Sequence, residues 1–141
     1  MVAMEGHLKP YAGRTVTDPR GWGRFIVCQL RGANGNSVSV VQGYMPTNST
    51  NAGAWQVQTQ MMLRVQKQLE EKQASGLTLT LEEQSTLLHL QVAHSAGGME
   101  LKPTPKSLLL HDLAGVLERL GSEYQVIGMD WNGCLPGMLH A

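Results

Sequence analysis

The chain has 141 residues, the size of one ordinary domain, and 42% of them are hydrophobic, which is enough for a core of moderate size. Its formal net charge is zero, so the total charge gives no general affinity for nucleic acid or for acidic membranes. The charge is uneven, however, because residues 1–52 hold Lys9, Arg14, Arg20, Arg24 and Arg31 against Glu5 and Asp18, whereas the remainder is net acidic.

The first half of the chain has the pattern of a β-hairpin. Residues 15–17 favour a short first strand. Residues 24–30 are rich in β-forming side chains, and valines alternate with serines at the start of residues 37–44, as in a half-buried strand. The connection between these two segments contains Asn34-Gly35, a strong signal for a tight turn. We therefore predict that the two longer strands form a hairpin.

Three amphipathic helices are predicted next, over residues 54–73, 81–93 and 106–120. Thr80 and Glu83 form a capping box at the start of the second helix. The side chains expected to face inward are Trp55, Met62, Val65 and Leu69 on the first helix, Leu87, Leu88 and Val92 on the second, and Leu109, Leu113, Val116 and Leu120 on the third.

An apolar strand is predicted over residues 124–129, after the last helix. Strands that flank long amphipathic helices indicate an α/β layered domain. We expect a fragment of a layered α/β sandwich, in which a β-hairpin is followed by helices and a further central strand. Residues 1–12 are expected to be irregular, residues 13–133 to form one partial domain, and residues 134–141 to form a short tail.

The two cysteines, Cys28 and Cys134, are too few for a disulfide framework and lack the spacing of a zinc site. The N-terminus has no basic segment followed by an apolar stretch, so no signal peptide is predicted. No apolar run approaches the roughly 20 residues of a membrane-spanning helix. We therefore expect an intracellular protein, cytoplasmic or nuclear, with no membrane partner.

Two polar clusters follow predicted strands. Tyr44 ends the hairpin, with Asn48 shortly after it, and Asp130 and Asn132 follow the last strand. Residues two positions apart leave a strand on the same face, and ligands of α/β sheets bind beyond the carboxyl ends of the strands. The two clusters therefore make one plausible site, and its oxygen ligands would suit Mg²⁺.

The order of these motifs resembles the endonuclease/exonuclease/phosphatase superfamily, whose members are metal-dependent phosphodiesterases and phosphatases of layered α/β form. The shared features are the Tyr-x-Pro motif at residues 44–46 after a strand, a helical region, and the Asp-x-Asn motif at residues 130–132 after an apolar strand. With Gly-Trp-Gly-Arg at residues 21–24, the chain is most similar to the endonuclease domains of non-LTR retrotransposons. The resemblance covers about residues 13–133.

The resemblance implies roles for individual residues. Tyr44 would contact the substrate phosphate, and Asp130 would orient or deprotonate the attacking water close to a Mg²⁺ or Mn²⁺ ion, for which it would be a weak ligand. Asn132 would form a hydrogen bond with the phosphate. Asn48 and Arg24 would contribute to substrate binding.

The chain also departs from the family pattern. Met129 stands where the family has a glycine before the aspartate, and the family's metal-binding glutamate and closing Asp-His pair have no recognisable counterpart. Only residues 133–141 follow the Asp-x-Asn motif. We therefore expect the middle part of such a domain, with low activity by itself and with a partner chain as one means of completing the sheet.

Other interpretations of these residues remain open. Asp130 is also a suitable turn or helix cap, Asn132-Gly133 is a good turn dipeptide, and Tyr44 and Trp22 are equally suited to packing. At the level of function, one alternative is a non-catalytic remnant that binds nucleic acid or protein through the basic N-terminal half. A second is an inactive fragment with unpaired strand edges. A nucleotide hydrolase is disfavoured because the chain has no Gly-rich phosphate loop with Lys-Ser/Thr.

Overall fold

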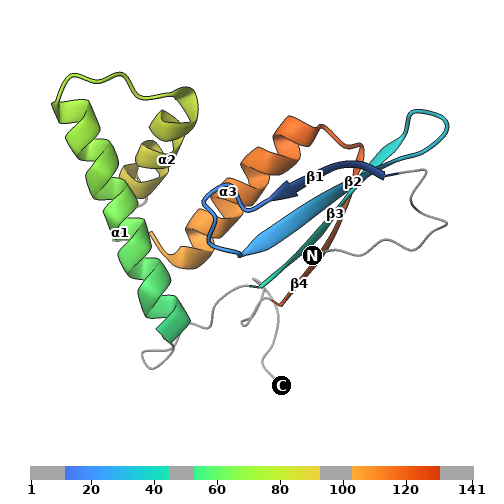
Figure 1. Ribbon diagram of the computed structural model, residues 1–141, viewed down its shortest axis with the longest axis horizontal. Helices are drawn as coiled ribbons and strands as arrows, with labels where there is room; N and C mark the ends of the chain where they lie inside the picture. The colour runs from blue at the N-terminus through green and yellow to red at the C-terminus, as the bar shows by residue number, and fades with distance from the viewer. Residues whose placement is uncertain (1–11, 45–52, 93–102, 131–141) are drawn as a thin grey trace. The chain divides into compact units, whose positions relative to one another are not determined.

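The computed structural model describes residues 12–44, 53–92 and 103–130, and its elements confirm the predicted mixed α/β class. The elements follow one another in the order shown in Figure 1. They are β1 (Ala12–Thr17), β2 (Phe25–Arg31), β3 (Ser37–Tyr44), α1 (Gly53–Ala74), α2 (Leu81–Val92), α3 (Pro105–Leu120) and β4 (Tyr124–Asp130). No helix among these described residues is long and apolar enough to cross a membrane.

The chain divides into two compact units. One contains the residues up to Met45 and from Asp112 onward, and the other runs from Pro46 to His111. The first unit holds the four strands and the second half of α3, and we call it the sheet unit. The other holds α1, α2 and the first half of α3, and we call it the helical unit.

The four strands form one mixed sheet in the order β1-β2-β3-β4. β1 pairs with β2 and β2 with β3 in antiparallel fashion, so the predicted hairpin is confirmed. Its register pairs Phe25 with Gly43 and Arg31 with Ser37. Gly35 adopts a φ of 81° at the tip, a conformation that glycine reaches without strain.

β4 is parallel to β3, with a register that runs from Val38 beside Tyr124 to Tyr44 beside Asp130. We expected this strand to be central. Among the described residues it instead lies at one edge of the sheet, with β3 as its neighbour. The helical segment between β3 and β4 supplies the long crossover that a parallel pair of strands needs.

The second half of α3 packs against one face of the sheet (Figure 1). The buried side chains of this face include Val27 and Val41, and α3 contributes Leu113 and Val116. Polar contacts fix the end of the helix: the Gln29 side-chain amide donates to the Leu120 carbonyl at 3.1 Å and to the Ser122 hydroxyl at 2.9 Å. The Ser39 hydroxyl lies 2.6 Å from the same Ser122 oxygen.

The helical unit has its own apolar cluster. Leu69 of α1, Leu79 and Leu87 of α2 are buried together, and Val65 packs against them. The predicted capping box is confirmed, because the Thr80 amide donates to the Glu83 carboxylate and the Glu83 amide donates to the Thr80 hydroxyl.

The prediction that Leu88 of α2 belongs to the core is wrong. Leu88 is 60% exposed, whereas Leu87 and Leu90 are buried. Successive helical residues point about 100° apart, and in α2 the buried leucines follow the i, i+3 spacing of Leu87 and Leu90, which leaves Leu88 on the exposed side of the helix. The predicted core residues that the structure buries are Met62, Leu69, Leu87, Leu109, Leu113, Val116 and Leu120. The side chain of Val92 lies outside the description.

Candidate functional site

The ends of β3 and β4 bring together the two polar clusters found in the sequence. Tyr44 and Asp130 are Cα partners at the carboxyl ends of these parallel strands. Tyr44 is 48% exposed, and its backbone N–H donates to the Arg24 carbonyl at 3.0 Å, which fixes the end of β3 against the start of β2. Asn48, Asn132 and the side chain of Asp130 lie outside the described residues.

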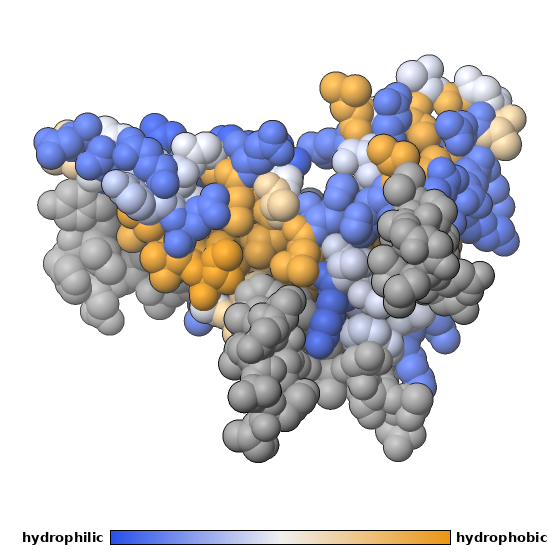
Figure 2. Space-filling view, turned by 180° about the vertical axis from the view of Figure 1, so that it is seen from behind, coloured by the Kyte–Doolittle hydropathy of each residue, from blue (hydrophilic) through white to orange (hydrophobic). Residues whose placement is uncertain are grey.

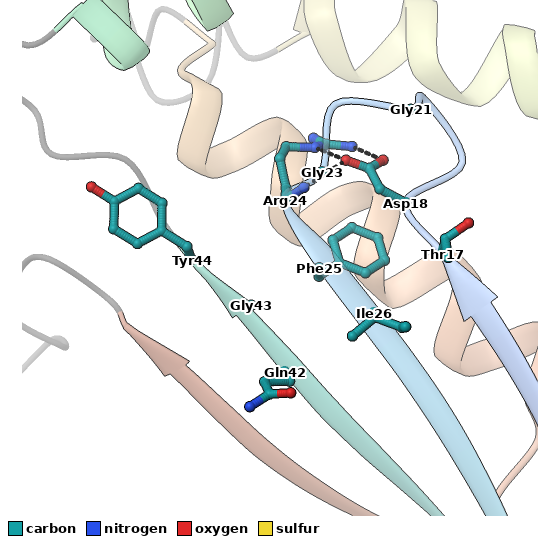
Figure 3. A pocket seen from close by; sticks show the side chains of 10 residues that line it. All are labelled: Thr17, Asp18, Gly21, Gly23, Arg24, Phe25, Ile26, Gln42, Gly43 and Tyr44. Carbon is teal, nitrogen blue, oxygen red and sulfur yellow. Dashed lines mark hydrogen bonds and ion pairs between the residues drawn. The ribbon is translucent and has the colours of Figure 1, made fainter. Parts of the chain in front are cut away.

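A pocket of about 510 Å³ opens beside Tyr44. Its wall combines the end of β1, the loop that follows, the start of β2 and the end of β3. In Figure 3, Tyr44 stands on one side of this group and the Asp18–Arg24 pair on the other. The lining residues are Thr17, Asp18, Gly21, Gly23, Arg24, Phe25, Ile26, Gln42, Gly43 and Tyr44.

The loop between β1 and β2 is shaped by a turn. Asp18 and Pro19 begin it, and the Gly21 N–H donates to the Asp18 carbonyl at 3.0 Å, which is the closing bond of a β-turn. Gly21 and Gly23 both have a φ of 70°, which a residue with a side chain rarely adopts. The Asp18 carboxylate also accepts from the backbone N–H groups of Arg20 and Arg24. One buried carboxylate therefore organises the loop that lines the pocket.

A cluster of two arginines and two aspartates joins this loop to α3. Arg24 donates from Nε and Nη2 to the two oxygens of Asp18, at 2.7 and 2.8 Å, and from Nη2 to Asp112 at 2.7 Å. Arg20 donates to both oxygens of Asp112, at 2.6 and 2.8 Å. The Arg24 guanidinium also lies over the Trp22 ring, 4.9 Å from its centroid. The cluster is formally neutral, because two guanidinium charges are paired with two carboxylates.

The pKa values of the pair show that both groups are charged at neutral pH. Burial acts to raise the pKa of Asp18, but hydrogen bonds from Arg24 and Arg20 and the positive charge of Arg24 outweigh it, so the net pKa is lowered. Burial acts to lower the pKa of Arg24, and the hydrogen bonds to Asp18 and Asp112 outweigh that effect, so its pKa is raised. The charged state is therefore maintained by partners rather than by water.

Arg24, which the resemblance implied in substrate binding, lies in this cluster. Its side chain has no exposed surface, and two of its nitrogens already donate to carboxylates. The third, Nη1, is buried and has no hydrogen-bond partner among the described residues. Arg24 shapes the wall of the pocket, and a direct contact between its guanidinium and a substrate stays a prediction.

The described residues do not form a metal site. They contain no group of three or more His, Cys, Asp or Glu side chains that could hold an ion. The carboxylates of Asp18 and Asp112 nearest the pocket are already paired with arginines. Asp130, the ligand that the resemblance implied for a Mg²⁺ or Mn²⁺ ion, has its side chain outside the described residues, so its role as a ligand stays a prediction.

Sequence reasoning did not identify Asp18 or Asp112. The Asp-Pro-x-Gly pattern at residues 18–21 is a turn signature that predicts the capping role of Asp18. Asp112 gives no such local signal, because it lies 88 positions from Arg24 and looks like any polar residue on a helix.

Comparison of the chain with protein families, with curated proteins and with solved structures finds no match.

Proposed function

We propose that the chain is a partial domain of the phosphodiesterase and endonuclease type, which binds a phosphate ester at the strand ends and hydrolyses it poorly or not at all by itself. The observation that supports this most is the alignment of Tyr44 with Asp130 at the ends of two parallel strands, beside the pocket. In α/β sheets, ligands bind beyond the carboxyl ends of the strands. The resemblance to metal-dependent phosphodiesterases depends on the same two residues.

The pocket offers chemistry for both parts of a phosphate ester. The Tyr44 hydroxyl is a donor for a phosphate oxygen, and it stands on an exposed residue. Phe25 and Ile26 give the same pocket an apolar wall suited to the organic part of the ester. Gly21 and Gly23 leave room, because a Cβ added at either would meet no atom within 4 Å.

Because the charged cluster beside the pocket is neutral overall, we expect weak phosphate binding and slow hydrolysis. Asp18 and Asp112 neutralise the charges of Arg24 and Arg20, so the cluster has no net positive charge to attract a phosphate. Phosphoryl transfer depends on neutralising the charge that develops on the phosphate oxygens. The described residues supply hydrogen bonds but little of this neutralisation.

In this proposal Asp130 orients the attacking water and Asn132 holds a phosphate oxygen, as the resemblance implies. A divalent metal would supply charge neutralisation if bound, and Asp130, the Cα partner of Tyr44, would be its ligand. Because the described residues form no metal shell, no step of the proposed binding depends on the ion.

The test of hydrolysis is nicking of supercoiled plasmid in Mg²⁺ or Mn²⁺. The variants to compare are Asp130→Ala, at the carboxyl end of β4, and Glu123→Ala, an exposed acidic residue just before β4. We expect slow, metal-dependent nicking that is lost in Asp130→Ala and kept in Glu123→Ala. Plasmid binding without nicking would restrict the proposal to its binding part. Neither binding nor nicking by the wild type would contradict it.

A second candidate is a non-catalytic remnant that binds nucleic acid through the basic N-terminal half. The structure favours Arg14 and Arg31 for this role, because both are exposed, whereas Arg20 and Arg24 hold the fold together. Replacing Arg14 and Arg31 by Gln should reduce binding and also its salt dependence, by about two phosphate contacts. Replacing Tyr44 by Phe should then have no effect. The reverse pattern supports the strand-end site.

A further inference from the structure

The face of the sheet that is turned away from α3 carries a row of side chains beside the pocket. Val27 and Val41 point toward α3. Neighbouring residues of a strand point to opposite faces, so Ile26 and Gln42 point away from the helix. The register places Thr17, Ile26 and Gln42 side by side on β1, β2 and β3. All three line the pocket, and Figure 3 shows them in a row across the three strands.

This row is polar at both ends and apolar in the middle. Gln42 and Thr17 are exposed, and neither side chain forms a hydrogen bond with any residue that the structure describes. Gln29, on the opposite face of β2, instead uses its amide in three hydrogen bonds. Ile26 lies half-buried between the two polar side chains. An amide with an open donor and an open acceptor therefore stands beside an apolar surface.

The neighbouring strand β4 leaves the row open. Gly128 is the Cα partner of Gln42, and a Cβ added there would meet only the Val41 carbonyl oxygen, at an ordinary 3.7 Å. Tyr44 lies two positions after Gln42 on β3, on the same face and about 7 Å farther along the strand. A short connector could therefore join a phosphate at Tyr44 to a group at the Gln42 amide.

We propose that this row binds the base of a nucleotide ester, with the ring flat on Ile26, its edge at the Gln42 amide and its phosphate at Tyr44. The inference rests on the proposed function and names the organic part of the ester. A base has apolar faces, and its edges carry the hydrogen-bond donors and acceptors with which a glutamine amide pairs. The sugar is the connector between base and phosphate, and Gln42 is the specificity-determining residue.

Other esters match the row less well. Hydrophobic side chains gather at the surface of the part of the chain that carries the sheet (Figure 2), so an apolar contact alone would not select this row. The acyl chain of a lipid would cover Ile26 but would displace water from Gln42 and Thr17 without replacing its hydrogen bonds. An inositol ring would place hydroxyl groups against the apolar Ile26. A planar ring with polar edges satisfies both kinds of surface.

The same geometry predicts that the base is unstacked. A ring that lies flat on the sheet cannot also be stacked between its neighbours in a duplex, and taking a paired base out of the stack costs free energy. Single strands present their bases freely, and proteins bind them by contacts to the ring faces. We therefore expect tighter binding of a single strand than of a duplex.

The experiment is competition against a labelled single-stranded oligonucleotide bound to the full chain, followed by fluorescence anisotropy. The competitors are the unlabelled single strand, a strand of the same length with abasic sites throughout, a blunt duplex, a mononucleotide and inositol phosphate. The variants are Gln42→Leu and, as the matched control, Gln125→Leu. Gln125 is also exposed and without a side-chain partner among the described residues, but the register places it beside Ser39. Circular dichroism confirms that each variant is folded.

We expect the wild type to bind the single strand at least about fivefold more tightly than the abasic strand or the duplex. Gln42→Leu should weaken binding of the single strand about three- to tenfold, the effect of one or two neutral hydrogen bonds. It should leave binding of the abasic strand unchanged. Gln125→Leu should bind every competitor as the wild type does.

Four results would overturn this inference. An abasic strand that binds as tightly as the normal strand shows that only the sugar and phosphate are bound. A duplex that binds as tightly as the single strand shows that the base is not unstacked. Unchanged binding of the single strand by Gln42→Leu places the base at another surface. Displacement by inositol phosphate but not by the mononucleotide assigns the pocket to a different ester.

These results leave the proposed function intact, because Tyr44→Phe tests the phosphate contact separately. That variant should weaken binding of the normal and the abasic strand by the same factor. If the wild type binds none of the strands and neither small ester, the proposed function is contradicted, and this inference falls with it.

Discussion

The two ends of the sheet are held together by different chemistry. At the pocket end, which contains Tyr44 and the loop after β1, buried charges of Arg24, Asp18 and Asp112 fix the strands to α3. At the hairpin end, which contains the β2–β3 turn and the start of β4, the corresponding contacts are neutral. There the amide of Gln29 and the hydroxyls of Ser39 and Ser122 join the sheet to the end of α3.

The difference shows that the buried ion pairs between the sheet and α3 lie at the pocket end. A buried ion pair gives little net stability over an apolar pair, yet removing one partner is very costly. A neutral hydrogen-bond network also joins the sheet to α3, and the loss of one of its partners costs less because no buried charge is left unpaired. Asp18 and Arg24 line the pocket at this end, so we infer that its charges define the shape of the loop and pocket more than they stabilise the fold.

The largest expected effect comes from breaking the charged cluster. Arg24→Leu leaves the Asp18 carboxylate buried without its main partner, and the free energy of unfolding should fall by about 3–5 kcal/mol. Urea denaturation followed by circular dichroism measures it. The control is Arg14→Leu at an exposed position of β1, which should change the free energy by no more than about 0.5 kcal/mol. Equal effects of the two variants would contradict the assignment of Arg24 as a buried structural residue.

A smaller loss is expected at the hairpin end. Gln29→Leu removes three hydrogen bonds, to the Leu120 carbonyl, the Ser122 hydroxyl and the Arg31 guanidinium. It leaves the buried Leu120 carbonyl without this donor, which should cost about 1–3 kcal/mol. Gln42→Leu, on the exposed side of β3, is the matched control and should be close to neutral. If Gln29→Leu destabilises the protein more than Arg24→Leu does, the comparison between the two ends is wrong.

Acid should affect the pocket end selectively. The folded pKa of Asp18 lies below its ordinary value of 3.8, so its contribution to stability is full above that value and is lost as the pH falls through the lowered folded pKa. Urea unfolding of the wild type should therefore require less urea at pH 3 and below than at neutral pH. Asp18→Asn should reduce this dependence on acid, whereas Gln29→Leu should leave it unchanged. An identical acid response in all three proteins would contradict the role of Asp18.

The smallest effects on stability are expected from the two exposed tyrosines. Tyr44→Phe at the pocket end and Tyr124→Phe at the start of β4 each remove only a hydroxyl, and both residues are largely exposed. The free energy of unfolding should change by no more than about 0.5 kcal/mol in either variant. A large loss in Tyr44→Phe would indicate that its hydroxyl is structural, and thermal melts of both variants would reveal it.

Local patterns were sufficient to predict the elements. Alternating valines and the Asn-Gly turn predicted the hairpin. The capping box at Thr80 correctly predicted that α2 begins at Leu81. The parallel alignment of Tyr44 with Asp130 follows from two strands that end in polar motifs and are joined by a helical crossover. These features depend on neighbours in the sequence or on general rules of sheet topology.

The features that could not be predicted depend on distant pairs. Nothing local marks Asp112 as the partner of Arg20 and Arg24, and the basic residues therefore looked like one solvated or polyanion-binding surface. The position of β4 at one end of the four described strands could not be predicted either, because an apolar strand is equally suited to the centre of a sheet. Leu88 was misplaced because adjacent leucines leave the phase of a helix ambiguous.

The central claim is that the pocket end binds a phosphate ester through Tyr44. The most direct measurement is fluorescence anisotropy of a labelled DNA oligonucleotide titrated with the wild type, Tyr44→Phe and Tyr124→Phe. We predict that Tyr44→Phe weakens binding about tenfold, the effect of one hydrogen bond to a charged phosphate, while Tyr124→Phe binds as the wild type does. Equal affinities of all three proteins, or equal losses in the two variants, would contradict a binding site at the ends of β3 and β4.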